Sequence, residues 1–513
     1  MKNVLIGIDV GTSGTKAAVV DTDGKILGEA LVGYPVICLE NGWAEQDALL
    51  WEQAVYQASG QAVKQAAVLA GVRPGDVAGI CVSGLFAGSG VPLDETMKPL
   101  RNAIIWMDRR AVLQCRNTRT LVSDEELFSI TGNRNDAYFG FNKILWIRDN
   151  EPDIWEKIRW LLSSNGYIVY CLTGEISMDH TAAANIGGIY DLDKGRWSYP
   201  TMERLGIRES LFPEHLMEPQ DIAGYLTEEA AMKMGLVPGI PVCAGCTDCL
   251  ASMISAGVFE ENVQTAVIGT SINWGILHRD FPTDSRLVTM PHAIAPKILK
   301  YTYGGISSAG VLCKWFLEQV APFTRRPGTV VETDFQILEK EAGRIPPGSG
   351  GLLVLPYFMG ERSPIWDSGA RGVFCGLSMK HTRAHMYRAV LEALSYACRQ
   401  IRETSPVFAL SGDTCIVSGG ACCSGLWMQI LADVTGLRII TTDDSVQAPA
   451  GDALIAGVSI GVIPSYEEGR KWARHKEVYE PDWDRFWIYD KYYKEYLRLY
   501  DATSGIVHSL ADM

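Results

Sequence analysis

No apolar run long enough to cross a membrane occurs in the sequence. A membrane-spanning helix needs about 20 predominantly apolar residues, and the chain has no such segment. The first residues, MKNVLIGIDVG, reach an acid at Asp9 after only a short apolar stretch, which is not the pattern of a secretory signal peptide. We therefore expect a cytoplasmic protein that has no membrane partner.

A surplus of positive charge is also missing. The 60 acidic residues outnumber the 46 Lys and Arg residues, which gives a formal net charge of −14 at pH 7. No basic cluster reverses this balance locally, so the electrostatic pattern of a nucleic-acid-binding protein is absent. Hydrophobic residues make up 47% and charged residues 21% of the chain, which indicates a folded globular protein rather than a disordered one.

The histidines and cysteines do not form a complete metal-binding pattern. In VCAGCTDCLASMISAG, residues 242–257, three cysteines recur at the spacing that ferredoxin-type segments use for an iron–sulfur cluster. The ferredoxin pattern expects a fourth cysteine after three intervening residues, and that position is Met253. The segment is either an incomplete cluster site that needs a remote ligand, or a tightly packed helix that starts near Asp248. The odd total of 13 cysteines favours free thiols over disulfides.

A glycine-containing loop occurs twice between apolar strands. In VLIGIDVGTSGTKAAVV, residues 4–20, a buried strand carries Asp9 near its end and leads to the loop 11–14, and a second strand follows. QTAVIGTSINWGIL, residues 264–277, repeats Gly-Thr-Ser between two strands. Loop N–H groups and hydroxyls of this kind can donate to phosphate oxygens, although neither the P-loop nor the Rossmann motif is present. Two copies predict two related domains that hold one nucleotide between them.

A third glycine pair follows a further strand. CIVSGGACCSGLWMQILADVTG, residues 415–436, predicts a strand, a turn at Gly419 and Gly420, and an amphipathic helix. Such a turn either brings the backbone against a flat ligand such as adenine or simply packs a strand closely on a helix.

An aromatic stripe lies near the end of the chain. Its members are spaced by three or four residues, which predicts one face of a helix; they are Trp483, Phe486, Tyr489, Tyr493, Tyr496 and Tyr500. The stripe is either core packing or the face of a homodimer.

Longer motifs resemble the FGGY family of carbohydrate kinases over nearly the whole chain. Its signatures are matched by YFGFNKILWIRDN at 138–150 and by GVFCGLSMKHTRAHMYRAVLEA at 372–393. Gly140 departs from the first signature, which usually has Pro, Ser or Thr there. NGWAEQD at 41–47 and GERSPIWDSGARGVFCGL at 360–377 are similar to the xylulokinase and gluconokinase branch. The resemblance implies an α/β fold of two ribonuclease-H-like domains, of the actin and hexokinase type, around a central cleft for ATP and sugar. The expected domains are residues 1–257 and 258–513.

The resemblance also implies roles for individual residues. Asp248 matches the catalytic base, and Asp9 matches the acid that organises Mg2+ through water. The residues that match the ATP-binding side are Gly11, Thr12, Ser13, Gly269, Thr270, Gly310, Gly419, Gly420, Ala421 and Ser424. The residues expected around the sugar, besides Asp248, are Phe86, Ala87, Trp106, Asp108 and Tyr138.

The implied reaction is ATP-dependent phosphorylation of a small sugar at a primary hydroxyl. Branch-level resemblance favours a ketopentose such as xylulose, with gluconate, glycerol or another polyol as alternatives. Xylulokinases typically have a Gln-Met-His-Gly run where this chain has SGLFAGSG, so Leu85, Phe86 and Ala87 replace polar groups. An alternative from a different class is an actin- or chaperone-like ATPase switch, which uses the same pair of phosphate loops.

Overall fold

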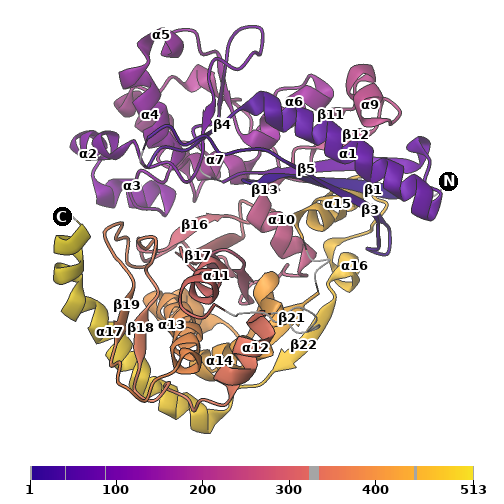
Figure 1. Cartoon of the computed structure of the whole chain (residues 1–513). Coiled ribbons are helices and arrows are strands. Elements are labelled where there is room, and N and C mark those ends of the chain that lie inside the picture. The colour runs from indigo at the N-terminus through magenta and orange to yellow at the C-terminus, as the bar shows by residue number, and fades with distance from the viewer. Residues whose placement is uncertain (1–2, 41, 87, 323–333, 444–446, 512–513) are drawn as a thin grey trace.

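Two mixed β-sheets with helices around and between them form the molecule, as the computed structural model shows (Figure 1). The structure describes residues 3–40, 42–86, 88–322, 334–443 and 447–511. The first sheet has the order β11-β12-β5-β1-β2-β3, and β13 pairs with β5. Its strands are β1 Val4–Val10, β2 Gly14–Asp21, β3 Ile26–Gly33, β5 Val77–Gly84, β11 Ile222–Tyr225, β12 Pro241–Cys243 and β13 Cys246–Thr247.

The second sheet lies in the later half of the chain and has the order β16-β17-β15-β14-β20-β21-β22. Its strands are β14 Gln264–Ile268, β15 Ile272–His278, β16 Val288–Pro291, β17 Lys300–Ile306, β20 Thr414–Ser418, β21 Arg438–Thr442 and β22 His475–Tyr479.

The two sheets repeat one pattern of strand directions. In the first, β1 is antiparallel to β2 and parallel to β5, β2 is antiparallel to β3, and β5 is parallel to β12, which is antiparallel to β11. In the second, β14 is antiparallel to β15 and parallel to β20, β15 is antiparallel to β17, and β20 is parallel to β21, which is antiparallel to β22. The duplication predicted from the repeated Gly-Thr-Ser segments is therefore confirmed.

The remaining elements connect and cover the sheets. The short strands are β4 Glu45–Gln46, β6 Val91–Leu93, β7 Ala103–Ile104, β8 Trp160–Leu162, β9 Tyr190–Asp191, β10 Arg196–Trp197, β18 Leu353–Leu355 and β19 Val373–Cys375. The helices are α1 Ala48–Ala70, α2 Val112–Leu121, α3 Asp124–Thr131, α4 Gly140–Asn150, α5 Pro152–Trp155, α6 Ser164–Thr173, α7 His180–Ile186, α8 Tyr199–Leu205, α9 Glu228–Met234, α10 Asp248–Ser255, α11 Gly310–Gln319, α12 Asp334–Gly343, α13 Arg383–Thr404, α14 Gly425–Thr435, α15 Ala448–Ser459, α16 Tyr466–Gly469 and α17 Trp483–Ala511. Short 3₁₀ turns are η1 Pro74–Asp76, η2 Glu209–Leu211, η3 Pro406–Leu410, η4 Gly420–Cys423 and η5 Arg470–Trp472.

Small residues let helices approach the first sheet closely. Helix α1 starts where the side chain of Asp47 accepts the N–H of Leu49, and its buried alanines pack on β2 and β3. On the other face, α15 packs on β1 and β5. A Cβ atom on Gly7 of β1 would lie only 1.7 Å from the carbonyl oxygen of Pro449 in α15, so a side chain there has no room. Helix α15, from the later part of the chain, therefore lies against the first sheet (Figure 1).

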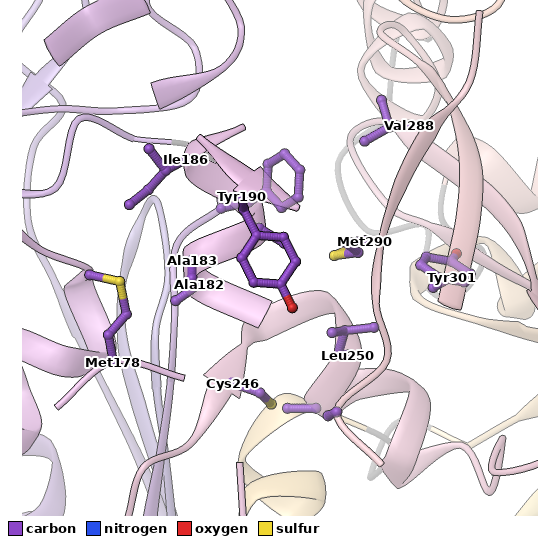
Figure 2. Close-up of a cluster of buried hydrophobic side chains, with 14 of the residues drawn as sticks. Met178, Ala182, Ala183, Ile186, Tyr190, Cys246, Leu250, Val288, Met290 and Tyr301 are labelled. Carbon is purple, nitrogen blue, oxygen red and sulfur yellow. The ribbon is translucent and has the colours of Figure 1, made fainter. Parts of the chain in front are cut away.

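An apolar cluster joins the two halves beneath α10. Figure 2 shows Ala182 and Ala183 from α7, Leu250 from α10 and Met290 from β16 in this cluster. These four side chains are at most 5% exposed. Because α10 begins with Asp248, this packing fixes the position of the helix that carries the proposed base.

The aromatic stripe of α17 is partly core. Tyr489, Tyr493 and Tyr496 are 0 to 3% exposed and surround Tyr396 of α13 with ring centroids 5.5 to 6.2 Å apart. Core packing is thus confirmed for these three tyrosines. Trp483, by contrast, is 57% exposed, and a homodimer stays a prediction. Within the described residues, no helix combines the length and apolar character that a bilayer span requires.

The close packing of α15 generates a test of stability. Gly7→Ala should lower the melting temperature, because overpacking of a well-packed core costs about 1–3 kcal/mol and occasionally more. Gly75→Ala is the matched control, since an added Cβ meets no atom within 4 Å there. Thermal unfolding of both variants measures the difference, and equal melting temperatures would contradict the packing of α15 on β1.

Candidate functional site

A tight turn places Asp248 at the first residue of α10. Gly245 has a φ of 77°, and a Cβ there would lie 1.8 Å from the carbonyl oxygen of Val82, so only glycine fits. The N–H of Thr247 donates to Oγ1 of Thr181 over 3.0 Å. The segment that contains the three cysteines therefore builds the turn before a helix, as one of the two sequence interpretations predicts.

The cysteines of this segment do not converge on a metal. Cys243 and Cys246 are fully buried in strands, and Cys249 lies in α10. In the described part of the chain, no group of three or more His, Cys, Asp or Glu side chains is arranged to hold a metal ion. All 13 cysteines are free thiols. The segment thus provides no ligand set for an iron–sulfur cluster among the described residues.

Asp9 and Asp248 share one desolvated region at the end of the first sheet. Asp9 of β1 and Cys246 of β13 both pair with Ser83 of β5, so Asp9 and the turn before Asp248 flank the same strand. Burial raises the pKa of Asp9, and the negative charge of Asp248 raises it further. Burial also raises the pKa of Asp248, while the N–H of Cys249, which donates to Oδ1 over 2.6 Å, opposes this. Two neighbouring acids with raised pKa values are typical of functional sites.

One oxygen of Asp9 fits a hydrated cation. Oδ1 of Asp9 is buried and has no hydrogen-bond partner among the described residues. Buried carboxylate oxygens normally accept a hydrogen bond, and a water molecule bound to a hard cation such as Mg2+ supplies a suitable donor. The residues present therefore fit a magnesium ion held through water.

The first Gly-Thr-Ser loop joins β1 to β2. The N–H of Gly11 donates to the carbonyl oxygen of Gly14 over 3.2 Å and closes the loop. Oγ1 of Thr12 accepts a hydrogen bond from Nε1 of Trp106 over 3.0 Å, which leaves its O–H able to donate to an anion. Ser13 is exposed at the tip. The loop offers hydroxyl donors of the kind that phosphate binding needs.

The second Gly-Thr-Ser loop joins β14 to β15 and rests on the start of α11. Gly269 and Thr270 are exposed. The N–H of Gly310 donates to the carbonyl oxygen of Gly269 over 2.9 Å, and a Cβ on Gly310 would lie 2.5 Å from that oxygen. Gly310 therefore supports the second loop directly.

The third glycine segment forms the predicted strand, turn and helix as β20, η4 and α14. Gly419 has a φ of 100°, whereas a Cβ on Gly420 would meet no atom within 4 Å, so the turn is open there. Ala421 is half-buried in η4. Oγ of Ser424 accepts the N–H of Trp427 over 3.2 Å at the start of α14 and donates to Oε1 of Glu339 over 2.9 Å.

Aromatic side chains gather on the side expected to hold the sugar. The ring of Tyr138 lies 5.3 Å from Phe86, 6.5 Å from Trp106 and 6.3 Å from Trp366, measured between centroids. Ala87 lies outside the described residues. These contacts bring together three of the residues expected at the sugar and add Trp366.

Asp108 is occupied by protein contacts. Its carboxylate is fully buried, accepts the N–H of Ala44 over 2.6 Å and pairs with Arg110 at 2.7 Å. The carboxylate of Asp108 is thus engaged by Ala44 and Arg110, and a direct contact with sugar stays a prediction.

A cavity of about 370 Å³ lies between the halves beside these aromatic residues. Side chains from both halves line it, including Trp106, Arg109, Asp136, Ser271, Glu361 and Arg362. The residues expected at the site from the sequence did not include Arg109, Asp136, Glu361 or Arg362. Two of them belong to the motif GERSP, so the signal was present in the sequence.

A third buried acid, Asp452, lies near Asp9 and Asp248. Oγ of Ser83 donates to its Oδ2 over 2.7 Å, and the side chain is fully buried in α15. Burial raises its pKa well above the ordinary value, and the negative charges of Asp9 and Asp248 add to this. Asp452 was not among the residues expected at the site, although an acid inside the apolar run APAGDALIAG is an available signal in the sequence.

Comparison with known proteins identifies the family. The sequence model described as FGGY family of carbohydrate kinases, N-terminal domain, matches residues 4–255, and that of the C-terminal domain matches residues 265–460. The chain belongs to this family. It is a carbohydrate kinase with the actin- and hexokinase-like α/β fold, so the resemblance found in the sequence is confirmed and the ATPase-switch alternative is set aside.

Individual FGGY kinases match over nearly their full length. Xylulose kinase of Bacillus subtilis (strain 168) is 30% identical over 511 residues, covering 98% of this chain and 97% of that protein. Gluconokinase of the same strain is 26% identical over 479 residues, covering 91% and 90%. The crystal structure of xylulose kinase from Rhodospirillum rubrum matches with a TM-score of 0.88 at 28% identity, covering 99% of this chain and 100% of that chain.

The raised pKa of Asp452 generates a prediction about stability and pH. The folded protein binds this proton more tightly than the unfolded chain, so the contribution of Asp452 to stability falls as pH rises above its unfolded pKa. Asp452→Asn cannot ionise and can still accept from Ser83. We expect the melting temperature of the variant to fall less between pH 5 and pH 8 than that of the wild type, by roughly 2 °C or more.

The exposed acid Asp484 gives the control for this experiment. Asp484→Asn should follow the wild type across the same pH range, because its side chain is exposed at the start of α17. Parallel wild-type and Asp452→Asn profiles would contradict the assignment of a buried, proton-binding carboxylate at Asp452.

Proposed function

We propose that this carbohydrate kinase phosphorylates a ketopentose such as xylulose at a terminal primary hydroxyl, with ATP as donor and Asp248 as general base. The observation that carries the proposal is the position of Asp248 and Asp9 together beside the first phosphate loop. The similarity to the xylulose kinases of Bacillus subtilis and Rhodospirillum rubrum supports xylulose as the acceptor.

The proposed chemistry moves one proton and one phosphoryl group. The sugar oxygen forms a bond to the γ-phosphorus while the bond from that phosphorus to the bridging oxygen of ADP breaks. The hydroxyl proton passes to the carboxylate of Asp248, and ADP leaves. A positioned base of this kind typically contributes about 10² to 10⁴ in rate. The raised pKa of Asp248 suits this role, because a stronger base accepts the proton more readily.

The two loops are proposed to hold the phosphates. Phosphoryl transfer depends mainly on in-line positioning and on stabilising negative charge, which N–H groups and hydroxyls provide. The proposed donors are Gly11, Thr12, Ser13, Gly269 and Thr270. The adenosine is proposed to lie along Gly310, Gly419, Gly420, Ala421 and Ser424.

Asp9 is proposed to hold Mg2+ through a water molecule at its unpaired oxygen. When bound, the ion supplies positive charge that neutralises the phosphate oxygens.

The aromatic side chains are proposed to form the wall of the acceptor pocket. Phe86 is 7% exposed and packs against Tyr138 and Tyr303, so it provides an apolar wall where the xylulokinase pattern has polar groups. Trp106 and Tyr138 complete the proposed wall. Gluconate, glycerol or another polyol remains the second candidate, and the gluconokinase of Bacillus subtilis supports it.

Three further points belong to the same proposal. The domain division is proposed to lie between residues 257 and 258. Residues 1–257 would hold the sugar and the first phosphate loop, and residues 258–513 would bind ATP. The enzyme is proposed to act in the cytoplasm. A homodimer is proposed as its assembly, with the exposed part of α17 as the contact.

Loss of the base should reduce catalysis much more than nucleotide binding. Asp248→Asn is expected to lower kcat by about 10² or more, because the carboxylate acts in the transition state and makes little contact with ATP. Steady-state kinetics and ATP titration measure the two effects. Cys246→Ser is the control within the same segment and should keep most activity. Near wild-type turnover by Asp248→Asn on the best acceptor would refute the assignment of the base.

A substrate panel tests the acceptor. ADP release with ketopentoses, aldonates, glycerol and other polyols should give the highest kcat/KM for a ketopentose. The reason is that the wrong acceptor leaves buried polar groups of the pocket unpaired. The resulting free-energy penalty lowers kcat/KM for that acceptor. If gluconate or glycerol ranks first and every ketopentose stays near background, the ketopentose assignment is wrong and the kinase assignment stands.

A further inference from the structure

We propose that Arg362 determines acceptor specificity by donating hydrogen bonds to the oxygens at the end of the sugar farthest from the phosphorylated carbon. For a ketopentose phosphorylated at its terminal primary hydroxyl, these are the C1 hydroxyl and the C2 carbonyl. This inference rests on the proposed function and names a contact that the family resemblance does not assign.

Arg362 is one of the charged residues that line the cavity between the halves. Its guanidinium forms no ion pair among the residues that the structure describes, although its charge acts to lower the pKa of the adjacent Glu361. Arg109, which also lines the cavity, pairs with Asp136 at 2.8 Å. A guanidinium carries several N–H donors in a planar fork, which suits two neighbouring oxygen acceptors. Arg362 therefore offers unused donors in a cavity of the size that small-molecule ligands occupy.

The position of this guanidinium is fixed from both halves. Its central carbon lies 5.6 Å from the ring centroid of Trp106, whose own N–H reaches Thr12 of the first phosphate loop. On the other side it packs on Gly305 of β17, where an added Cβ would lie 2.7 Å from Nη2. An acceptor that contacts Arg362 is thereby placed relative to the phosphate loop.

Glu361 holds the backbone that carries Arg362. Its Oε1 accepts the N–H groups of Ser307 and Arg362, each over 2.8 Å. Glu361 is 6% exposed, burial raises its pKa to about 7, and Oε2 has no partner among the described residues. Glu361 is thus a positioning residue for Arg362.

The segment is also anchored to the end of the chain. Oδ2 of Asp367 lies 2.7 Å from the hydroxyl of Tyr500, which donates to it, and 2.7 Å from Nε2 of His508. Trp366 donates from Nε1 to the carbonyl oxygen of Arg286 over 2.7 Å. These contacts hold the segment that follows Arg362, so the backbone from which its side chain extends is pre-organised for a ligand.

Arg362→Lys and a trimmed acceptor together test the proposal. The best acceptor of the panel is compared with its analogue that lacks the oxygen at the carbon farthest from the phosphorylated one; for a ketopentose this is the 1-deoxy sugar. The wild type should prefer the full acceptor by about tenfold or more in kcat/KM, because a hydrogen bond to a charged group is lost with the analogue. In Arg362→Lys most of this preference should disappear, with the loss mainly in the KM for the sugar.

The control separates specificity from stability. Arg371→Lys changes an exposed arginine of the neighbouring segment whose Nη1 bonds only to backbone oxygens of Ser368 and Ala370, and it should keep the wild-type preference. ATP affinity should be the same in both variants. An unchanged preference in Arg362→Lys would overturn the proposal, whether kcat/KM stays at the wild-type value for both acceptors or falls by the same factor for both.

Failure of this inference is distinct from failure of the proposed function. If Asp248→Asn abolishes turnover while Arg362→Lys retains the full preference, only the role of Arg362 is wrong. If the panel selects another acceptor, the same comparison with its own deoxy analogue still decides whether Arg362 reads the far end.

Discussion

The contact of α15 with the first sheet is the constraint on which the site depends. It is possible only because Gly7 leaves room for the backbone at Pro449, and Gly451 allows equally close contact with Ala251 of α10. A helix from late in the chain, the strand that carries Asp9 and the helix that begins with Asp248 are thereby held together. Their acids share a region with little water, and this raises the pKa of each.

Features that depend on local sequence could be predicted. Both Gly-Thr-Ser loops lie in hairpins because glycines between apolar, strand-forming segments favour tight connections. Helix α10 begins at Asp248, and the strand, turn and helix around Gly419 form as expected. The family signatures then supplied the fold. In the loops, at the start of α10 and around Gly419, neighbours in the sequence are also neighbours in space, so a short pattern contains the necessary information.

Features that depend on tertiary contacts could not be predicted in the same way. Asp452 reaches Ser83 across 369 positions of the chain, and no local pattern specifies such a partner. The contact of the Asp108 carboxylate with the N–H of Ala44 is likewise tertiary, and the sequence did not indicate it or the ion pair with Arg110. Arg362 belongs to the motif GERSP, but that motif does not indicate that Arg362 lies against Trp106 and Gly305, which are far from it in the sequence.

The duplicated sheets are alike in backbone and unlike in charge. Asp9 pairs with Ser83 in the first sheet, and Val267 pairs with Ser418 at the matching place in the second. Glycine follows both serines. The acid is therefore confined to one member of a nearly symmetric pair, and the symmetry of the fold does not extend to its electrostatics. A polar molecule lying between the two sheets meets different surroundings at its two ends, so a symmetric scaffold still dictates a single direction of binding.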